Sequence, residues 1–341
     1  MIPHSWRFFT LAAAWCVLVG PAGAAQQPIA RSEIRQNLFS ACFSTNQNGW
    51  VVGELGRVFH TTDGGATYTR SDTGVRTPFL AVACLPDGSV VITGPKGVAM
   101  KSRDQGDTWQ PLQTGVKREL LSVAFPTAQV GVAVGDFGTI MRTEDGGATW
   151  SKIPLPTDFT LPADVAEIVD PGDVLLYDVD FPTPDRGWVV GEFGVIFTTA
   201  DGGKTWATQK SPVETTLFGV QFADATNGWA TGIEQVLLHT SDGGQTWSKQ
   251  AVPGQQGFVL GLYDVAVQGN VGWAIGDSGL LLRTTDGGNT WTRIELPIRL
   301  AGNWFRGIAL SRGTSGIIVG SEGEILLTNG DQFHELMRGP S

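Results

Sequence analysis

The chain has 341 residues, and its 23 Lys and Arg against 33 Asp and Glu give a formal net charge of −10. An acidic protein of this net charge is repelled by nucleic acids and by anionic membrane surfaces, so neither is a good candidate for its partner. Glycine occurs 46 times and tryptophan 12 times. Many turn residues combined with many large rings favour an all-β protein built from repeats over a helical one.

The first 25 residues have the pattern of an export signal. Arg7 supplies a positive charge, residues 8–20 are apolar, and small residues at 21–25 offer a cleavage site. No later stretch is long and apolar enough to span a bilayer. We therefore predict a signal peptide at 1–25, a lead-in at 26–37, and a mature protein in the periplasm or an equivalent compartment such as the thylakoid lumen, without direct membrane insertion.

A turn of eight residues recurs through the rest of the chain, in its clearest form as Thr-Ser-Asp-Gly-Gly-Gln-Thr-Trp at 240–247. Asp-Gly between alternating apolar runs predicts a β-hairpin, whose Asp carboxylate accepts backbone N–H groups across the turn. A calcium site is a poor interpretation, because one turn offers fewer oxygens than the roughly six to eight that calcium prefers. Successive turn aspartates are 41, 41, 56, 41 and 44 residues apart. They are Asp63, Asp104, Asp145, Asp201, Asp242 and Asp286.

Four short strands are expected in each repeat. In the fifth copy they are predicted at 217–222, 229–231, 236–240 and 246–250, with turn residues between them. Seven such sets fill residues 38–338, and the last of them lacks the stereotyped turn. Four-stranded units at this period are typical of a β-propeller. We predict one all-β domain, a seven-bladed β-propeller of four-stranded antiparallel blades; a linear solenoid would need polar capping repeats, and none is evident.

Two questions about this ring stay open at the level of sequence. The last blade is completed either by its own residues 333–336 or by residues 28–32 from the N-terminus. Cys42 and Cys84 fall in the first strands of neighbouring repeats, on sheet faces that look toward each other. They form either a disulfide across two blades or a pair of small buried thiols.

The repeated turn is similar to the Asp-box of bacterial neuraminidase repeats. The fuller pattern joins Leu-x-x-Val-x-Phe, Gly-Trp-Val-Val-Gly-Glu-x-Gly and Thr-x-Asp-Gly-Gly-x-Thr-Trp. Over about residues 35–338 it resembles the photosystem II stability and assembly factors and their relatives in non-photosynthetic bacteria. The resemblance implies a seven-bladed propeller without enzymatic activity or cofactor. We expect a monomer that binds a protein partner and assists a membrane-protein complex on the exported side of the membrane.

Two other functions compete with this expectation. A sialidase-like glycoside hydrolase needs a tyrosine nucleophile, an acid/base aspartate and three arginines; repeat symmetry explains the tyrosines here, and a third arginine near the first strands is lacking. A small-ligand-binding propeller would use the central channel, which the first strand of each blade lines. The candidate channel residues are Tyr177, Asp178, Tyr263, Asp264, Trp304 and Arg306.

The turns between second and third strands are predicted on the ring face opposite the repeated Asp-Gly turns, together with the links between blades. The 56-residue gap adds one long loop there, residues 151–175, with four prolines and several acids. Long loops on a rigid scaffold are common binding sites, and the negative charge favours a basic or neutral protein segment as partner. Acids also suit turns and keep an exported protein soluble, which is the simpler interpretation. The candidate residues are Glu54, Asp136, Glu192, Asp277 and Glu322 in the turns, and Asp158, Asp164 and Glu167 in the loop.

Overall fold

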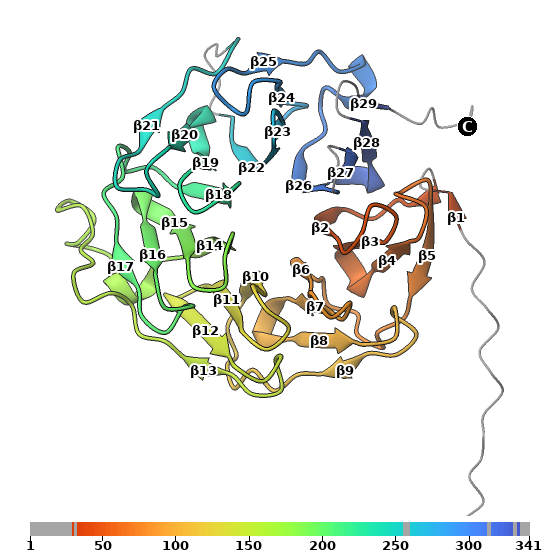
Figure 1. Ribbon diagram of the computed structural model, residues 1–341, viewed down its shortest axis with the longest axis horizontal. Helices are drawn as coiled ribbons and strands as arrows, with labels where there is room; N and C mark the ends of the chain where they lie inside the picture. The colour runs from red at the N-terminus through yellow and green to blue at the C-terminus, as the bar shows by residue number, and fades with distance from the viewer. Residues whose placement is uncertain (1–28, 31–32, 255–259, 312–314, 330–332, 335–341) are drawn as a thin grey trace, which may run out of the picture.

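The computed structural model describes residues 29–30, 33–254, 260–311, 315–329 and 333–334. Seven antiparallel sheets stand around a central axis as the blades of a propeller (Figure 1). Six blades have four strands and the first has five, which confirms the predicted fold. The predicted signal peptide at 1–25 lies outside the described residues. Within the described ranges, no helix is long and apolar enough to cross a membrane.

Within each blade the strands follow one another outward from the axis in chain order. The inner strands are β2 (Leu38–Phe43), β6 (Ala81–Cys84), β10 (Leu120–Ala124), β14 (Leu176–Asp180), β18 (Leu217–Phe222), β22 (Leu262–Gln268) and β26 (Phe305–Leu310). The second strands are β3 (Gly49–Gly53), β7 (Val90–Thr93), β11 (Gly131–Gly135), β15 (Gly187–Gly191), β19 (Gly228–Gly232), β23 (Val271–Gly276) and β27 (Ser315–Gly320). The third strands are β4 (Val58–Thr61), β8 (Ala99–Ser102), β12 (Thr139–Thr143), β16 (Ile196–Thr199), β20 (Leu237–Thr240), β24 (Leu281–Thr284) and β28 (Ile325–Asn329).

The outer strands are short. They are β5 (Thr67–Ser71), β9 (Gln110–Pro111), β13 (Ser151–Lys152), β17 (Ala207–Thr208), β21 (Ser248–Lys249), β25 (Thr292–Arg293) and β29 (Phe333–His334). Five of the turns from second to third strand are single 3-10 turns, η2 (Glu54–Gly56), η3 (Pro95–Gly97), η5 (Glu192–Gly194), η6 (Ile233–Gln235) and η8 (Ser321–Gly323). Two further 3-10 turns lie in links between blades. They are η4 (Pro171–Asp173) and η7 (Ile298–Leu300).

The core lies between adjacent blades. Strand β15 begins with Gly187 because the Phe181 ring, just after β14, occupies the space of a side chain: an added Cβ would lie 2.5 Å from it. The next residue, Trp188, is fully buried and stacks on Phe222 of the following blade, with 3.5 Å between ring centroids. The Leu-x-x-Val-x-Phe and Gly-Trp patterns of successive repeats therefore meet in one packed cluster.

The sequence offers two candidates for the outer strand of the last blade, and the structure distinguishes between them. The last blade is completed by its own strand β29, which pairs with β28. Strand β1 (Ile29–Ala30) pairs instead with β5 and adds a fifth strand to the first blade, so the assignment of residues 28–32 to the last blade is wrong. Two contacts join the last blade to the first. The Glu322 backbone N–H donates to Asn37 Oδ1 at 2.9 Å, and the Phe39 ring stacks on Trp304.

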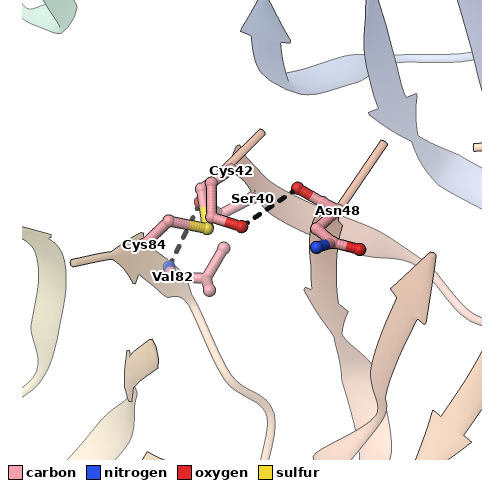
Figure 2. The surroundings of a disulfide bond; sticks show 6 residues. Ser40, Cys42, Asn48, Val82 and Cys84 are labelled. Atoms are coloured by element: carbon pink, nitrogen blue, oxygen red, sulfur yellow. Dashed lines mark hydrogen bonds between the residues drawn. A yellow bond between two sulfur atoms is a disulfide. The ribbon is translucent and has the colours of Figure 1, made fainter. Parts of the chain in front are cut away.

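A disulfide joins the first two blades. Cys42 of β2 and Cys84 of β6 are bonded, with 5.8 Å between their Cα atoms (Figure 2). The Val82 N–H also donates to Ser40 Oγ at 3.3 Å across the same pair of inner strands. The alternative of two free thiols is therefore wrong, since the facing sheets bring both sulfurs to bonding distance.

Candidate binding face

In the repeated turns the Asp carboxylate is hydrogen-bonded to two Thr or Ser side chains and to a backbone N–H group. In the turn of β20 and β21, Asp242 Oδ1 accepts the Thr246 N–H at 2.9 Å and the Thr240 hydroxyl at 2.8 Å, while Oδ2 accepts the Thr246 hydroxyl at 2.6 Å. These bonds, above all the one from the Thr246 hydroxyl, lower the pKa of Asp242 to about 2. The same arrangement recurs at Asp63, Asp104, Asp145, Asp201 and Asp286.

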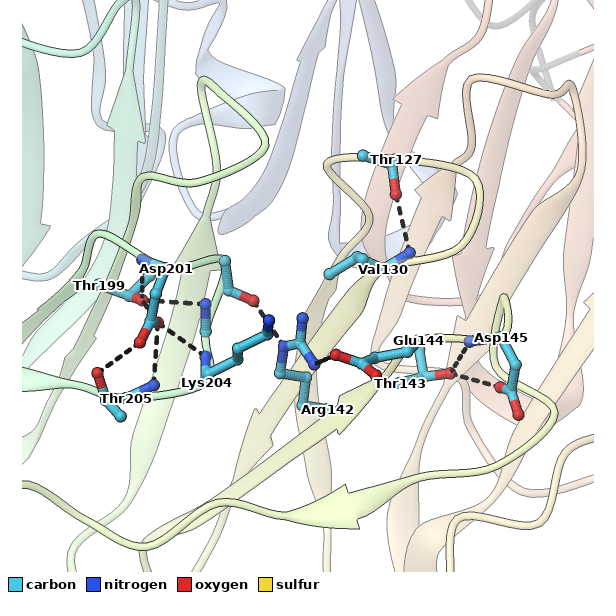
Figure 3. A network of polar contacts seen from close by, with 12 residues as sticks. Thr127, Val130, Arg142, Thr143, Glu144, Asp145, Thr199, Asp201, Lys204 and Thr205 are labelled. Carbon is cyan, nitrogen blue, oxygen red and sulfur yellow. Dashed lines mark hydrogen bonds and ion pairs between the residues drawn. The ribbon is translucent and has the colours of Figure 1, made fainter.

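Five of the six turns also accept a hydrogen bond from a side chain of the preceding blade. The Arg142 Nε donates to the Gly202 carbonyl of the next blade at 2.7 Å and pairs with Glu144, between the turns of Asp145 and Asp201 (Figure 3). Equivalent bonds run from Ser71 to Gly106, Lys101 to Gly146, Gln209 to Gly243 and Gln250 to Gly288. The repeated turns therefore fasten one blade to the next.

The two faces of the ring carry the loops that the sequence predicts. On one face, the Asp-Gly turns bond to the turns between first and second strands, as where the Gly64 N–H donates to the Gln47 carbonyl at 2.9 Å. On the other, the turns between second and third strands bond to the links between blades, as where the Glu54 N–H donates to the Asn37 carbonyl at 2.9 Å. We call the second face the link face.

All five predicted turn acids lie in turns of the link face. Four of them accept hydrogen bonds within their own blades. Glu54 Oε1 accepts the Asn37 Nδ2 at 2.8 Å. The other three accept backbone N–H groups just ahead of the inner strand: Asp136 from Glu119, Glu192 from Leu175, and Asp277 from Gly261. Glu322 differs, because it occupies the next position of its turn. These carboxylates hold the turn against the inner strand of the same blade.

Apart from Glu322, the next position in each of these turns was not predicted as a candidate from the sequence. It has a left-handed backbone in every blade, with φ between 49° and 60°. Leu55 is 59% and Phe137 43% exposed at this position, whereas Phe193 is half-buried against the core cluster between blades. The seven tip residues are Leu55, Lys96, Phe137, Phe193, Glu234, Ser278 and Glu322. The signal available in the sequence was a large apolar residue standing between an acid and a turn glycine.

The mouth of the central channel is an aromatic funnel on the link face, with a volume of about 320 Å³. The Phe218 ring lies between two tyrosines, with its centroid 5.2 Å from that of Tyr177 and 5.3 Å from that of Tyr263. The Arg306 guanidinium lies 5.9 Å from the Phe39 ring and 6.0 Å from the Tyr263 ring. The structure thus brings Tyr177, Tyr263 and Arg306 together, with Trp304 stacked on Phe39 at the edge.

Phe39 and Phe218 are funnel residues that the sequence did not reveal. A register shift at the start of the inner strand, between Leu38 and Ser40 and between Leu217 and Gly219, turns the residue in between toward the mouth. A signal was present, since both residues occupy the strand position of Tyr177. However, the regular alternation of exposed and buried residues along a strand does not predict where a one-residue bulge will change the direction of a side chain.

Asp178 and Asp264 also line the funnel, and their carboxylates bridge successive inner strands. Asp178 Oδ1 accepts the Ser122 hydroxyl at 2.7 Å, and its Oδ2 accepts the Val220 N–H at 2.9 Å. Asp264 Oδ2 accepts the Ile308 N–H at 3.0 Å. Burial raises the pKa of Asp178 and, together with the neighbouring charge of Asp178, that of Asp264. Both candidate channel aspartates therefore connect blades across the ring interior.

The long loop lies along the outside of the fourth blade (Figure 1). Asp158 Oδ1 accepts the Thr208 hydroxyl at 3.1 Å, and Phe159 packs on Phe197 with 5.1 Å between ring centroids. The loop continues through hydrogen-bonded turns at 162–169, where Ile168 is 84% exposed. Of the predicted loop acids, Asp158 is thus tied to the blade edge, while Asp164 and Glu167 are exposed. Within the described part of the chain, no group of three or more His, Cys, Asp or Glu is placed to hold a metal ion.

A rigid ring with one face of exposed aromatic and apolar side chains defines a propeller suited to binding. Residues 160–211 and 205–334 match the family model described as photosynthesis system II assembly factor YCF48. Together these segments span 160–334, more than half of the chain, and the chain belongs to this family. The resemblance seen in the repeat motifs is confirmed.

Three solved structures illustrate the similarity of fold. "YCF48 bound to D1 peptide" is 18% identical with a TM-score of 0.68, covering 91% of this chain and 96% of that one. YCF48 from Cyanidioschyzon merolae is 22% identical with a TM-score of 0.69, covering 91% and 100%. The GH74 xyloglucanase from Xanthomonas campestris is 16% identical with a TM-score of 0.68, covering 90% of this chain and 54% of that one. No curated protein matches the sequence.

Proposed function

We propose that this chain is a non-catalytic binding factor that assists the assembly of a membrane-protein complex by holding a segment of one of its subunits. Membership of the YCF48 family carries the proposal. A similar propeller has been solved with a D1 peptide, which supports a protein segment as the kind of partner. The aromatic funnel and the exposed turn tips of the link face supply apolar contact area of the type that dominates protein interfaces.

The proposed place of action is the exported side of a membrane, in the periplasm or a comparable lumen. The disulfide between Cys42 and Cys84 supports this, because such bonds persist in oxidising compartments and are rare in the cytosol. The export pattern of residues 1–25 agrees with it. The proposed factor acts as a monomer.

A glycoside hydrolase is the competing function, because a GH74 enzyme shares the fold. The Tyr263 hydroxyl donates to Asp277 Oδ1 at 2.8 Å, so a tyrosine–carboxylate pair does lie in the funnel. However, burial and the Asp277 carboxylate raise the pKa of Tyr263 to about 12, whereas a nucleophile needs a lowered pKa. Among the described residues that line the funnel, Arg306 is the one base. We therefore favour binding over hydrolysis.

Two measurements test the proposal together. Affinity purification of the tagged protein from the native cell envelope, with chemical crosslinking and mass spectrometry, should recover a subunit of a membrane-protein complex. Incubation with xyloglucan and with a fluorogenic sialoside should release no product. Glycan hydrolysis without a membrane-protein partner would overturn the proposal in favour of an enzyme.

A further inference from the structure

The mouth of the channel is surrounded by seven side chains, one from the start of the inner strand in each blade. Six of them stand at the register shift that begins this strand, and the seventh directly precedes β6. All seven line the funnel, and six of the seven are aliphatic or aromatic. They are Phe39, Leu80, Leu121, Tyr177, Phe218, Tyr263 and Arg306. We call this ring of side chains the collar.

The collar already holds one cation against aromatic rings. The guanidinium of Arg306, an exposed side chain, lies 5.9 Å from the centre of the Phe39 ring and 6.0 Å from that of Tyr263. A positive charge within about 6 Å of a ring centre is attracted by the negative face of the ring. The rings of Tyr177 and Phe218, in the fourth and fifth blades, stand at 81° to each other. Because Arg306 is the one base among the described residues that line the funnel, these two rings carry no cation of the protein itself.

Carboxyl groups follow two of the aromatic positions of the collar. Asp178 and Asp264 line the funnel one residue further along their strands, so that two carboxyl groups stand against the single guanidinium of Arg306. Asp178 accepts three hydrogen bonds and Asp264 two, of the roughly four that a carboxylate can accept. Burial raises the pKa of both groups, and a positive charge placed beside them favours their ionised form. The funnel therefore suits a positively charged ligand better than an anion.

We propose that the funnel binds an organic cation with an alkylated ammonium head group. The head group lies against the faces of Tyr177 and Phe218, near the carboxylate of Asp178. Aromatic faces attract such a group strongly, because its charge is spread over alkyl groups that are poorly hydrated. A volume of about 320 Å³ leaves room for a small compound of this class. The inference goes beyond the proposed function, because a cation held in the channel requires no membrane-protein partner.

A matched pair of compounds separates charge from shape. Choline and 3,3-dimethylbutanol have nearly the same shape, but only choline carries a positive charge. In isothermal titration calorimetry of the full mature chain at low ionic strength, choline should bind at least tenfold more tightly than the alcohol. Equal affinities for the two compounds, or no heat with choline at millimolar concentration, would overturn the proposal.

The aromatic contribution is tested by Phe218→Leu, which removes a ring face and keeps an apolar side chain. This variant should bind choline at least fivefold more weakly and change the affinity for the alcohol less than twofold. The matched control is Phe137→Leu, which alters a phenylalanine of the link face outside the funnel and should keep both affinities. An equal loss of both compounds in Phe218→Leu, or the same loss of choline in the control, would contradict a cation site.

The sign of the ligand charge is tested by two further variants. Arg306→Gln removes the cation of the protein that lies on the same collar, so choline should bind at least threefold more tightly. Weaker binding would assign the funnel to an anionic or neutral ligand instead. Asp178→Asn should bind choline at least fivefold more weakly; its amide can keep the contact with Ser122, whose hydroxyl accepts as well as donates. Unchanged affinity for choline in this variant would also count against the proposal.

The cation has two conceivable sources, a free small compound or the lysine side chain of a bound protein segment. Titration with acetyl-Gly-Lys-Gly-amide beside choline distinguishes them, since the source that fits better binds more tightly. Either order supports the site provided that the two probes compete with each other and that Phe218→Leu weakens both. Simultaneous binding of both probes without competition would show that the collar is not the site, and would overturn the proposal.

Discussion

At the scale of single residues, the carboxylates of the channel and of the repeated turns titrate in opposite directions. The turn aspartates are ionised far below neutral pH, since threonine hydroxyls and N–H groups stabilise the anion. Asp180, by contrast, lies half-buried in the channel wall, and loss of hydration raises its pKa to about 7 although Oδ2 accepts the Phe222 N–H at 2.7 Å. The neighbouring charge of Asp178 adds to this rise. The ring interior therefore holds one carboxyl group, that of Asp180, that binds a proton near neutral pH.

This predicts a specific pH dependence for Asp180→Asn. The pKa of Asp180 is raised in the folded state, so its contribution to stability is present below pH ~4 and is lost as pH rises to about 7. The asparagine keeps an oxygen that can accept the Phe222 N–H and cannot ionise. The free energy of unfolding in urea, measured from pH 4 to pH 8, should therefore fall less steeply for the variant than for the wild type. Parallel profiles would show that Asp180 ionises as easily in the folded protein as in the unfolded chain.

At the scale of single elements, four of the blades share one close contact, between a phenylalanine ring at the end of the first strand and the glycine that begins the second. A Cβ on Gly187 would lie 2.5 Å from the Phe181 ring, and the same contact recurs at Gly131 with Phe125 and at Gly228 with Phe222. The glycine is required here for space, because the phenylalanine ring covers the start of the second strand. The ring in turn fills the cluster between blades.

Replacement of Gly187 by alanine should therefore destabilise the protein by about 1–3 kcal/mol, the usual cost of overpacking. Gly302 offers a control in a link between blades, where no atom lies within 4 Å of an added Cβ. Gly302→Ala should be close to neutral. Equal unfolding free energies for the two variants in urea would show that the second strand shifts away from the ring at little cost.

The strand pattern was predictable from sequence because each blade repeats a strong local signal. The Gly-Trp strand is buried at every position and the phenylalanine strand buries its Leu, Val and Phe, so the sheets, the ring and the two faces follow from these motifs. The pairing of strand β1 with β5 was not predictable, since nothing in the sequence of Ile29–Ala30 favours one exposed sheet edge over another. The funnel was found only in part, because a bulge changes the direction of Phe39 and Phe218 without altering composition. The turn tips were missed because their left-handed backbone follows from the turn as a whole.

At the scale of the whole molecule, the ring is closed without exchange of strands between the chain ends. The first and last blades are each complete, and the seam depends on contacts such as that between Phe39 and Trp304. Next to this seam the disulfide ties the first blade to the second. It closes a loop with a sequence separation of 42 residues, and so restricts the unfolded chain.

Replacement of both Cys42 and Cys84 by serine should lower the free energy of unfolding by about 4 kcal/mol, the chain-entropy estimate for a loop of this length. Adding a reductant to the wild-type protein should have a similar effect, whereas the serine variant should not respond to it. Denaturant unfolding with and without reductant measures both. A wild type that is insensitive to reductant after full reduction, verified by mass, would contradict this role.

The central claim is that the link face, and not the opposite face, holds a subunit of a membrane-protein complex. Site-specific photocrosslinking in the native envelope tests it most directly, with a benzophenone amino acid placed at Phe137 on the link face or at exposed Gln245 in a repeated turn on the other face. The account predicts a crosslink to one membrane-protein subunit from position 137 and none from position 245. Crosslinks to that subunit from position 245 alone, or to no membrane protein from either position, would contradict it.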